Sequence, residues 1–288
     1  MKVVCIHKAV RPHRIHRAWY ESIDAEYFPK TGFFSTPPKA DVYIIDGMAS
    51  IPPLLFHDGK VILLNSDTFF YNLKRAGFFK KLIYNFCLGR VDAIISTSNM
   101  LRDMAKPHTC VPHKVVYPFA EEKFFKVNMN PNSKNIGYFG RFTEEKNLDL
   151  IVRVFKRLKN KGKLYLIGGE YKTDDKDIIV VPFTDRVEDY MKKCGLFIML
   201  SRYDSFGVSI IESMAMGLPT VVSNTCGAKE IVSPDFVVEL NEDKIVEIIN
   251  NLTLKQRKEY GRYNKLTAIN YTKDRSIKRF KEAFTSVI

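Results

Sequence analysis

The chain has 288 residues, which is long for one domain and comfortable for two. Its 45% hydrophobic and 27% charged residues are ordinary for a globular protein, and its longest uncharged apolar run, at residues 194–200, is far below the roughly 20 residues of a membrane span. The net charge of +13 favours an anionic partner, which could be nucleic acid, anionic lipid headgroups or a phosphate-bearing substrate. A basic surface with no specific anion is the alternative.

The amino terminus and the cysteines indicate the compartment. The opening MKVVCIHKAVR has an apolar run too short for a signal peptide, so we expect no export. The five cysteines are scattered, without a Cys-x-x-Cys pair or histidines at metal-binding spacing nearby. We therefore expect reduced thiols in a cytoplasmic protein.

Short apolar runs rich in β-branched residues alternate with helical patterns along the chain. They predict strands at residues 2–6, 41–46, 60–65, 92–97 and 114–118, and then at residues 135–140, 163–168, 177–182, 196–200 and 219–224. This alternation predicts two parallel sheets, each covered by helices on both faces. At the carboxyl end of the chain, Ile277, Phe280 and Phe284 recur at helical spacing and predict an amphipathic closing helix.

A polar segment at residues 120–135 breaks the periodicity and predicts a domain boundary. We assign residues 1–119 to an N-terminal Rossmann-like domain and residues 120–273 to a C-terminal one, with a closing helix at 274–288 that packs back on the first. Parallel sheets bind ligands at the carboxyl ends of their strands, so two such domains that face each other would form an interdomain cleft.

The first candidate site follows the strand predicted at residues 135–140. Arg141 leaves the carboxyl end of that strand directly after Gly140, and Lys146 follows five residues later. A guanidinium offers a fork for two oxygens and an ammonium a mobile point charge, so the pair suits a diphosphate. Two solvated loop charges are the alternative.

The second candidate site follows the strand predicted at residues 196–200, in the stretch YDSFGVSIIESMAMGLPTVV. Asp204 lies in the loop, and a helix begins after Gly207, which lets the backbone approach a ligand closely. The leading amides of this helix form an anion-binding site. Glu212 lies inside the helix among apolar residues, where a carboxylate needs hydrogen-bond donors. Ribose hydroxyls could supply them, and so could a nearby lysine or a capping amide.

The order and spacing of these residues resemble those of glycosyltransferase family 4, which comprises retaining enzymes of the GT-B fold with nucleotide-sugar donors. Family members show Gly-Arg with a Lys five residues on, then an acidic residue, a Gly-Phe-Gly-like turn, a Glu after seven intervening residues, and Ala-x-Gly-x-Pro. This chain has Gly140-Arg141 with Lys146, then Asp204, Ser205-Phe206-Gly207, Glu212, and Ala215 to Pro219. The likeness is densest over residues 135–232.

The resemblance implies an α/β protein of the GT-B class, with two facing Rossmann-like domains, the acceptor on the first and the nucleotide sugar on the second. It implies a retaining, metal-independent hexosyltransferase that needs no cofactor. The donor substrate would be a UDP- or GDP-linked sugar, and the acceptor a hydroxyl on a glycan, glycolipid or glycoprotein.

Carried over by position, the resemblance also implies roles for single residues. Arg141 and Lys146 would hold the diphosphate, and Asp204 would orient the transferred sugar together with the amides of Phe206 and Gly207. Glu212 would bind the ribose diol. The catalytic set is then Arg141, Lys146 and Asp204, and the donor-binding set is Gly140, Phe183, Ser205, Phe206, Gly207, Val208 and Glu212, with Phe183 beside the nucleobase.

The chain departs from the family at several positions. Asp204 replaces the usual Glu, Ser205 replaces a Gly, and Ser66 with Asp67 replaces a His-Asp pair. A catalytically silent GT-B scaffold is therefore an alternative. No metal site is expected, because the adjacent Asp174 and Asp175 fall in a hairpin-like loop that we predict to be solvated.

The N-terminal half carries the acceptor-side candidates, which are Lys8, Arg11, Ser66 and Asp67. Residues 69–86 interleave lysine and arginine with aromatic residues, like a helix that lies on an anionic membrane, and a core helix with its lysines in water is the alternative. These features favour a glycan or lipid-linked acceptor and a peripheral contact with the inner membrane face. A base-glucosylating enzyme that acts on nucleic acid, or a plain nucleic-acid-binding protein, is the competing hypothesis.

Overall fold

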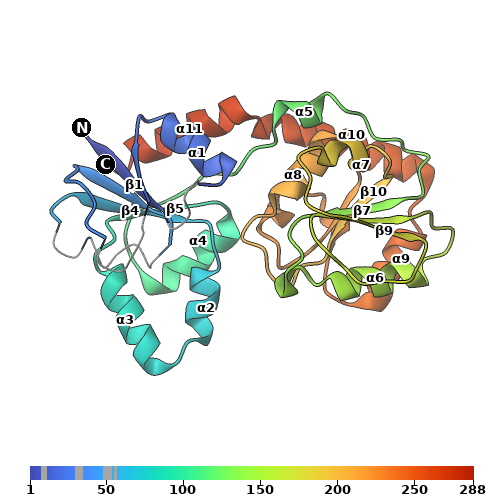
Figure 1. Cartoon of the computed structure of the whole chain (residues 1–288), viewed down its shortest axis with the longest axis horizontal. Helices are drawn as coiled ribbons and strands as arrows, with labels where there is room; N and C mark the ends of the chain where they lie inside the picture. Colours follow the sequence, from blue (N-terminus) through green and yellow to red (C-terminus); the bar gives the residue numbers. More distant parts are fainter. Residues whose placement is uncertain (8–11, 30–34, 48–53, 55–56) are drawn as a thin grey trace. The chain divides into compact units, whose positions relative to one another are not determined.

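The computed structural model of the chain describes residues 1–7, 12–29, 35–47, 54 and 57–288. Its contacts divide the chain into two compact units (Figure 1). The N-terminal unit comprises Met1–Pro118 together with Asp274–Ile288, and the C-terminal unit comprises Phe119–Lys273. The last segment of the chain therefore belongs to the same unit as the first.

The N-terminal unit is built on a six-stranded parallel sheet of order β2-β1-β3-β4-β5-β6. Its strands are β1 (Val3–His7), β2 (Glu26–Pro29), β3 (Val42–Ile45), β4 (Lys60–Asn65), β5 (Ala93–Ser96) and β6 (His113–Val115). The central strands are buried along almost their whole length, as apolar strands between two helical layers must be.

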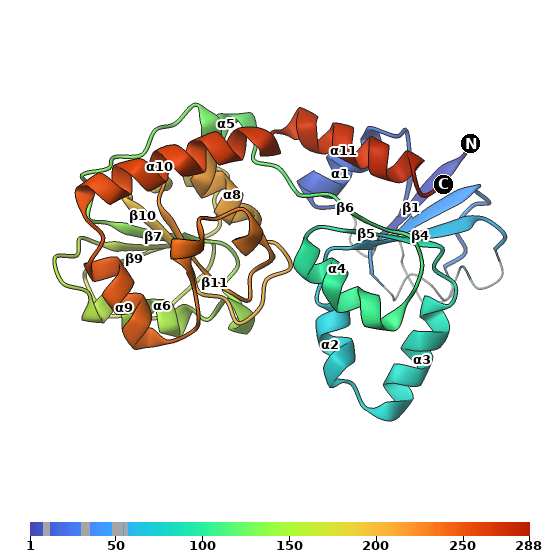
Figure 2. The ribbon, with the colours of Figure 1, turned by 180° about the vertical axis from the view of Figure 1, so that it is seen from behind.

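Helices cover both faces of this sheet (Figures 1 and 2). On one face lie α1 (Arg14–Glu21) and α11 (Lys273–Thr285), and on the other lie α2 (Phe69–Arg75), α3 (Phe78–Leu88) and α4 (Asn99–Ala105), which η3 (Lys106–His108) extends. Trp19 of α1 stacks on Phe280 of α11 with ring centroids 5.2 Å apart, and its indole N–H donates to Ser276 Oγ at 3.0 Å. The closing helix is thus anchored to the N-terminal unit by a buried aromatic pair and a hydrogen bond.

The C-terminal unit has a second six-stranded parallel sheet, of order β12-β11-β10-β7-β8-β9. Its strands are β7 (Ile136–Phe139), β8 (Leu164–Ile167), β9 (Ile178–Val181), β10 (Leu196–Met199), β11 (Thr220–Ser223) and β12 (Val237–Val238). From β7 the chain adds strands outward to β9, returns beside β7 with β10 and continues to the opposite edge. This is the doubly wound order of a Rossmann sheet.

Two helical layers also cover this sheet, with α8 and α10 on one face and α6 and α9 on the other (Figure 1). The helices of the unit are α5 (Glu122–Phe125), α6 (Leu148–Arg157), α7 (Val187–Met191), α8 (Val208–Ala215), α9 (Glu242–Asn250) and α10 (Leu254–Ala268), with shorter turns η4 (Glu144–Lys146), η5 (Gly227–Glu230), η6 (Pro234–Phe236) and η7 (Ile269–Tyr271). Among the described residues, no helix is both long and apolar enough to cross a bilayer.

All ten strands predicted from the sequence are present. The structure has two further strands, β2 and β12, that the sequence patterns did not predict. Two local predictions were wrong. Residues 69–86 form two helices instead of one, because Ala76 and Gly77 are extended, with ψ of 147° and 166°. The loop that carries Asp174 and Asp175 is not hairpin-like, because β8 and β9, the strands on either side of it, run parallel. A parallel connection must return the chain to the starting edge of the sheet, which a hairpin does not do.

Candidate functional site

The C-terminal sheet reverses its winding direction between β7 and β10, which are neighbours in the sheet. Ligands of such sheets bind at the carboxyl edge of this switch point, because the loops that leave the two strands diverge there. The loop after β7 carries Gly140 to Lys146, and the loop after β10 carries Ser201 to Gly207. The topology therefore brings both candidate sites to one edge of one sheet.

Lys146 and Asp204 form a buried ion pair at this edge. The ammonium nitrogen of Lys146 lies 2.6 Å from Oδ2 of Asp204, and each side chain is only 10% exposed. The other carboxylate oxygen of Asp204 accepts from the backbone N–H of Phe206 at 3.3 Å. The sequence suggested separate tasks for the lysine and the aspartate, whereas the structure joins them in one charged centre.

Hydrogen bonds from backbone and side-chain amides hold the two loops together around this pair. The backbone N–H of Arg202 donates to the carbonyl of Glu145 at 2.7 Å. Asn147, in the left-handed conformation with φ of 57°, donates from its side-chain amide to the carbonyl of Leu200 at 3.1 Å. On its other side the Asp204 loop is fastened to residues 225–227, where the N–H of Gly227 donates to the carbonyl of Asp204 at 2.9 Å. The pair is therefore preformed rather than assembled from mobile loops.

Helix α8 starts directly beside the ion pair. Gly207 precedes it with φ of +87°, and a Cβ at this position would lie 2.7 Å from Cδ1 of Ile210 and 3.3 Å from Oδ2 of Asp204. Only glycine fits both this conformation and this space. The leading amides of a helix have no intrahelical partner and carry the positive end of its dipole, so they favour an anion here. Glu212 lies one turn further into α8 and is 4% exposed.

Two of the remaining predicted donor residues, Gly140 and Arg141, lie in the loop after β7. Arg141 has an exposed side chain, while its carbonyl accepts from the hydroxyl of Tyr138 at 2.9 Å. Gly140 lies against Gly168, where an added Cβ would meet the carbonyl oxygen of Gly140 at 2.3 Å, so the loops after β7 and β8 touch through their backbones.

The other predicted donor residues lie after β9 and at the start of α8. Phe183 follows β9, the edge strand two positions from β7, and is 81% exposed. Ser205 and Val208, which flank the start of α8, are half-buried.

On the N-terminal unit, two acceptor-side candidates can be placed. Ser66 and Asp67 follow β4, and Lys8 and Arg11 lie outside the described residues. The hydroxyl of Ser66 donates to Oδ1 of Asp46 at 3.1 Å. Asp67 accepts from the backbone N–H of Phe69 at 2.8 Å, at the start of α2. Ser66 thus belongs to a polar cluster that the sequence did not predict.

The other members of that cluster are His7, His16 and Asp46. Oδ2 of Asp46 lies 2.8 Å from Nε2 of His7 and 2.7 Å from Nδ1 of His16, and the three side chains are only 9% to 15% exposed. Burial alone would raise the pKa of Asp46, but the positive charge and hydrogen bonds of His16 and His7 outweigh it and hold this pKa well below its usual value. The three ligand atoms lie within 4.8 Å of one another, so among the described residues this cluster could hold a metal ion.

The cluster also occupies a switch point. His7 ends β1 and Asp46 follows β3, the two neighbours between which the N-terminal sheet reverses its order. The positions of these two residues at the ends of predicted strands could have identified them from the sequence. His16 could not have been found in this way, because it lies on α1 and reaches the cluster only through the packing of that helix.

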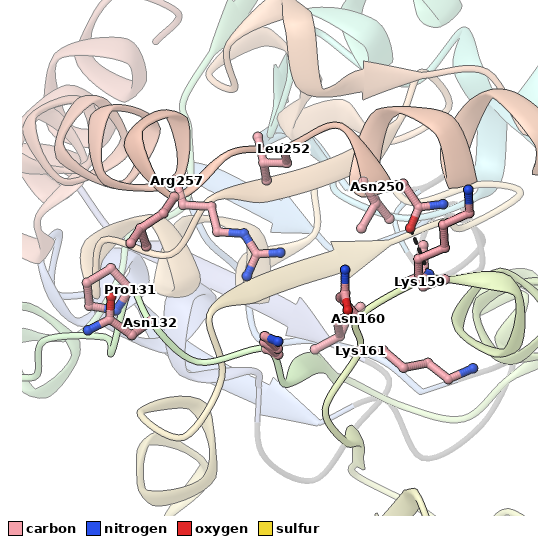
Figure 3. A pocket seen from close by; sticks show the side chains of 13 residues that line it. Pro131, Asn132, Lys159, Asn160, Lys161, Asn250, Leu252 and Arg257 are labelled. Carbon is pink, nitrogen blue, oxygen red and sulfur yellow. Dashed lines mark hydrogen bonds between the residues drawn. The ribbon is translucent and has the colours of Figure 1, made fainter.

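A cavity of about 530 Å³ lies at the amino ends of the strands of the C-terminal sheet, opposite the candidate donor site (Figure 3). It is lined by residues that precede β7 and β8, among them Lys134 and Lys161, and by Arg257 of α10. The guanidinium of Arg257 donates to the carbonyl of Ser133 at 3.0 Å, and burial lowers its pKa. Because the cavity lies at the amino ends of the strands, it is separate from the site that contains Lys146.

Several curated proteins are similar in sequence to the chain. It is 24% identical over 233 residues to an uncharacterized glycosyltransferase of Methanocaldococcus jannaschii, which covers 74% of this chain and 63% of that protein. It is 26% identical over 202 residues to the human GDP-Man:Man(3)GlcNAc(2)-PP-Dol alpha-1,2-mannosyltransferase, and this match covers 56% of this chain and 40% of the human protein. A Bacillus subtilis relative, the uncharacterized glycosyltransferase YqgM, is 31% identical over 124 residues, covering 37% and 34%. The matches span about one third to two thirds of the length of these relatives.

Solved structures share the fold over the whole chain. Sucrose-phosphate synthase from Thermosynechococcus elongatus matches with a TM-score of 0.81 and 12% identity, covering 100% of this chain and 99% of that one. HepE of Anabaena in complex with UDP-glucose matches with a TM-score of 0.76 and 13% identity, covering 99% and 100%. These matches confirm the predicted GT-B class with two Rossmann-like domains.

The family model described as glycosyl transferases group 1 matches residues 119–267, which is more than half of the chain. The matched segment includes both loops of the switch point, from Gly140 to Lys146 and from Ser201 to Gly207, and all of α8. The chain therefore belongs to the family of glycosyl transferases group 1.

Proposed function

We propose that the chain is a glycosyltransferase whose nucleotide-diphosphate sugar binds at the carboxyl edge of the C-terminal sheet. The observation that carries this proposal is the buried Lys146–Asp204 pair beside the first turn of α8. An ammonium kept largely out of water, next to the positive end of the α8 dipole, is suited to bind a pyrophosphate. The donor complex of HepE with UDP-glucose and the GDP-mannose named for the human relative support a UDP- or GDP-linked donor.

In the proposed complex, the cations and the leading amides of α8 surround the pyrophosphate. Lys146 contacts it from inside the unit, and Arg141, whose side chain is exposed, closes over it from the solvent side. Glu212, whose side chain is buried in α8, accepts hydrogen bonds from the ribose hydroxyls in this complex. Asp204 holds the ammonium in place and turns toward the transferred sugar.

The proposed reaction is a hexosyl transfer with retention. As the bond between the anomeric carbon and the diphosphate breaks, negative charge grows on the leaving phosphate, and Arg141, Lys146 and the α8 amides stabilise it. A preorganised donor of this kind contributes roughly 3 to 4 kcal/mol to the transition state. The leaving phosphate accepts the proton of the attacking hydroxyl on the same face, so the configuration at the anomeric carbon is kept.

We place the acceptor at the switch point of the N-terminal sheet, where Asp46, His7 and His16 offer partly buried hydrogen-bonding groups. A site built from such groups suits the hydroxyls of a sugar. The names of three relatives support a glycan or lipid-linked acceptor, namely a capsular polysaccharide glycosyltransferase, a lipopolysaccharide core mannosyltransferase and the mannosyltransferase that acts on a dolichol-linked glycan.

A donor panel tests the proposal. UDP- and GDP-linked sugars are added one by one, and thermal shift selects the binder, since a ligand at 100 times its Kd stabilises the fold by about 2.7 kcal/mol. Nucleotide release from the selected donor is then measured for Arg141→Ala, which we expect to lose about 100- to 1,000-fold. Arg262→Ala, an exposed arginine of α10, is the matched control. Release by Arg141→Ala equal to that of the parent would reject the diphosphate role.

A further inference from the structure

Helix α3 turns its apolar face to solvent, the reverse of what a helix on a globular domain normally does. The side chains concerned are Phe78 (76% exposed), Phe79 (79%), Leu82 (59%), Ile83 (62%) and Phe86 (70%). They recur at intervals of one, three and four residues, so they form one continuous stripe along the helix. The opposite side of α3 is anchored, because Cys87 and Leu88 lie in the hydrophobic core of the N-terminal unit.

The surroundings of this stripe are basic. Residues 68–89 contain Lys74, Arg75, Lys80 and Lys81 and no aspartate or glutamate. Helical spacing places Lys80 and Lys81 on the two sides of the apolar stripe. In the N-terminal unit, α2 and α3 lie together on one face of the sheet, and the turn that joins them points away from it (Figures 1 and 2). The stripe therefore begins at the outermost end of the helix pair.

We propose that α3 docks the protein on an anionic phospholipid bilayer. Its apolar stripe would enter the boundary between headgroups and acyl chains, and the flanking lysines would contact lipid phosphates. This inference does not depend on the proposed reaction, because docking requires no bound donor. It would bring the chain to a surface on which lipid-linked acceptors are found.

The charge pattern argues for this occupant over two others. A second copy that packed against the same face would bring identical lysines together, and like charges across an interface are costly. Nucleic acid would satisfy the cations and could stack on phenylalanine rings, but it has no alkyl chains in which the aliphatic side chains of Leu82 and Ile83 could be buried. A bilayer satisfies both the cations and the aliphatic side chains.

The test is sedimentation with vesicles of phosphatidylglycerol and phosphatidylcholine at low salt. We expect the triple variant Phe79→Ser, Ile83→Ser, Phe86→Ser to bind at least tenfold more weakly than the parent. The matched control is Tyr263→Ser with Leu266→Ser on α10, because these two side chains are also exposed, by 46% and 62%. All these side chains are on the surface, so each variant should keep the melting temperature and the donor-induced thermal shift of the parent.

A charge reversal separates the two components of docking. Lys80→Glu with Lys81→Glu should weaken binding at least tenfold, since each cation near an anionic surface contributes about fivefold. Lys258→Glu with Arg262→Glu, which changes the net charge by the same amount on α10, should bind nearly as the parent does. In addition, Phe79→Trp should show a blue-shifted tryptophan emission when vesicles are added, because the new indole enters the bilayer boundary.

Four results would overturn the proposal. The first is a parent protein that does not sediment with anionic vesicles, and the second is a triple variant that binds as the parent does. The third is a parent that dimerises through α3, shown by light scattering in which the triple variant is monomeric. The fourth is duplex DNA that displaces the vesicles and loses its own binding in the triple variant. None of these results affects the donor site, which the thermal shift reports separately.

Discussion

Replacement of Lys146 by methionine is the most informative perturbation of the C-terminal unit. The side chains of Lys146 and Asp204 are each 10% exposed and 2.6 Å apart, so the variant leaves a carboxylate buried without its ammonium. Breaking such a pair on one side typically costs about 3 to 5 kcal/mol. For a unit of this size, 1 kcal/mol corresponds to roughly 2 to 4 °C, so we expect the melting temperature to fall by about 6 to 20 °C.

The assay is a double-mutant cycle in urea, with Lys146→Met, Asp204→Leu and the two combined. Both single variants should lose about 3 to 5 kcal/mol of unfolding free energy, whereas the double variant should lose at least 2 kcal/mol less than their sum, because it buries no charge. The exposed pair Lys126–Glu122, with side chains 70% and 81% exposed, is the control, and Lys126→Met should cost less than about 1 kcal/mol. Additive losses below 1 kcal/mol at Lys146 and Asp204 would refute a buried, coupled pair.

Three further predictions concern single residues. Glu212→Gln should raise the Kd of the nucleotide donor about 10- to 150-fold in calorimetry, because it removes a charged acceptor for the ribose hydroxyls. Gly168→Ala should lower the unfolding free energy by about 1 to 3 kcal/mol in urea, since φ is +123° and its Cβ would lie 2.3 Å from the carbonyl oxygen of Gly140. Burial and the charges of Arg102 and Lys106 lower the pKa of His113 to about 4, so this histidine stays neutral in the fold while the unfolded chain takes up its proton as the pH falls below about 6.5. As the pH falls from 6.5 to 4, the free energy of unfolding of the parent should therefore decrease by about 1 to 2 kcal/mol more than that of His113→Gln. This figure includes a reduction for the partial exposure of the imidazole to solvent. Thermal melts of both proteins across this pH range measure the difference.

Each of these predictions has its own control. Glu247→Gln, on the exposed side of α9, should leave the donor Kd unchanged, and an unchanged Kd for Glu212→Gln as well would count against the ribose contact. Gly77→Ala meets no atom within 4 Å and should not destabilise the chain, so equal stability of Gly168→Ala would contradict the close backbone approach. For His113, parallel pH curves of parent and variant would show that this residue does not couple folding to protons.

Local sequence patterns predicted most of the fold. Strands such as β4 and β10 were found because their residues are apolar on both faces, which few other elements require. β2 was missed because its residues are half-buried or exposed and it ends in Pro29, so the apolar signal is absent at this sheet edge. β12 was missed because two residues carry no periodicity.

The candidate site was accessible from the sequence only in part. Spacing predicted that Arg141 and Lys146 would follow one strand and Asp204 another, and the strand order places both loops at one switch point. The contact between Lys146 and Asp204 joins residues 58 positions apart, so no local pattern contains it. The same holds for the His7–Asp46–His16 cluster, in which three separate elements meet.

The most direct test of the donor site is a crystal structure of the protein with the UDP- or GDP-linked sugar that the thermal shift selects. We predict pyrophosphate oxygens within hydrogen-bonding distance of the Lys146 ammonium and the Arg141 guanidinium, and ribose hydroxyls on Glu212. A nucleotide bound instead in the cavity lined by Lys134 and Arg257, at the amino ends of the strands, would contradict the proposed site.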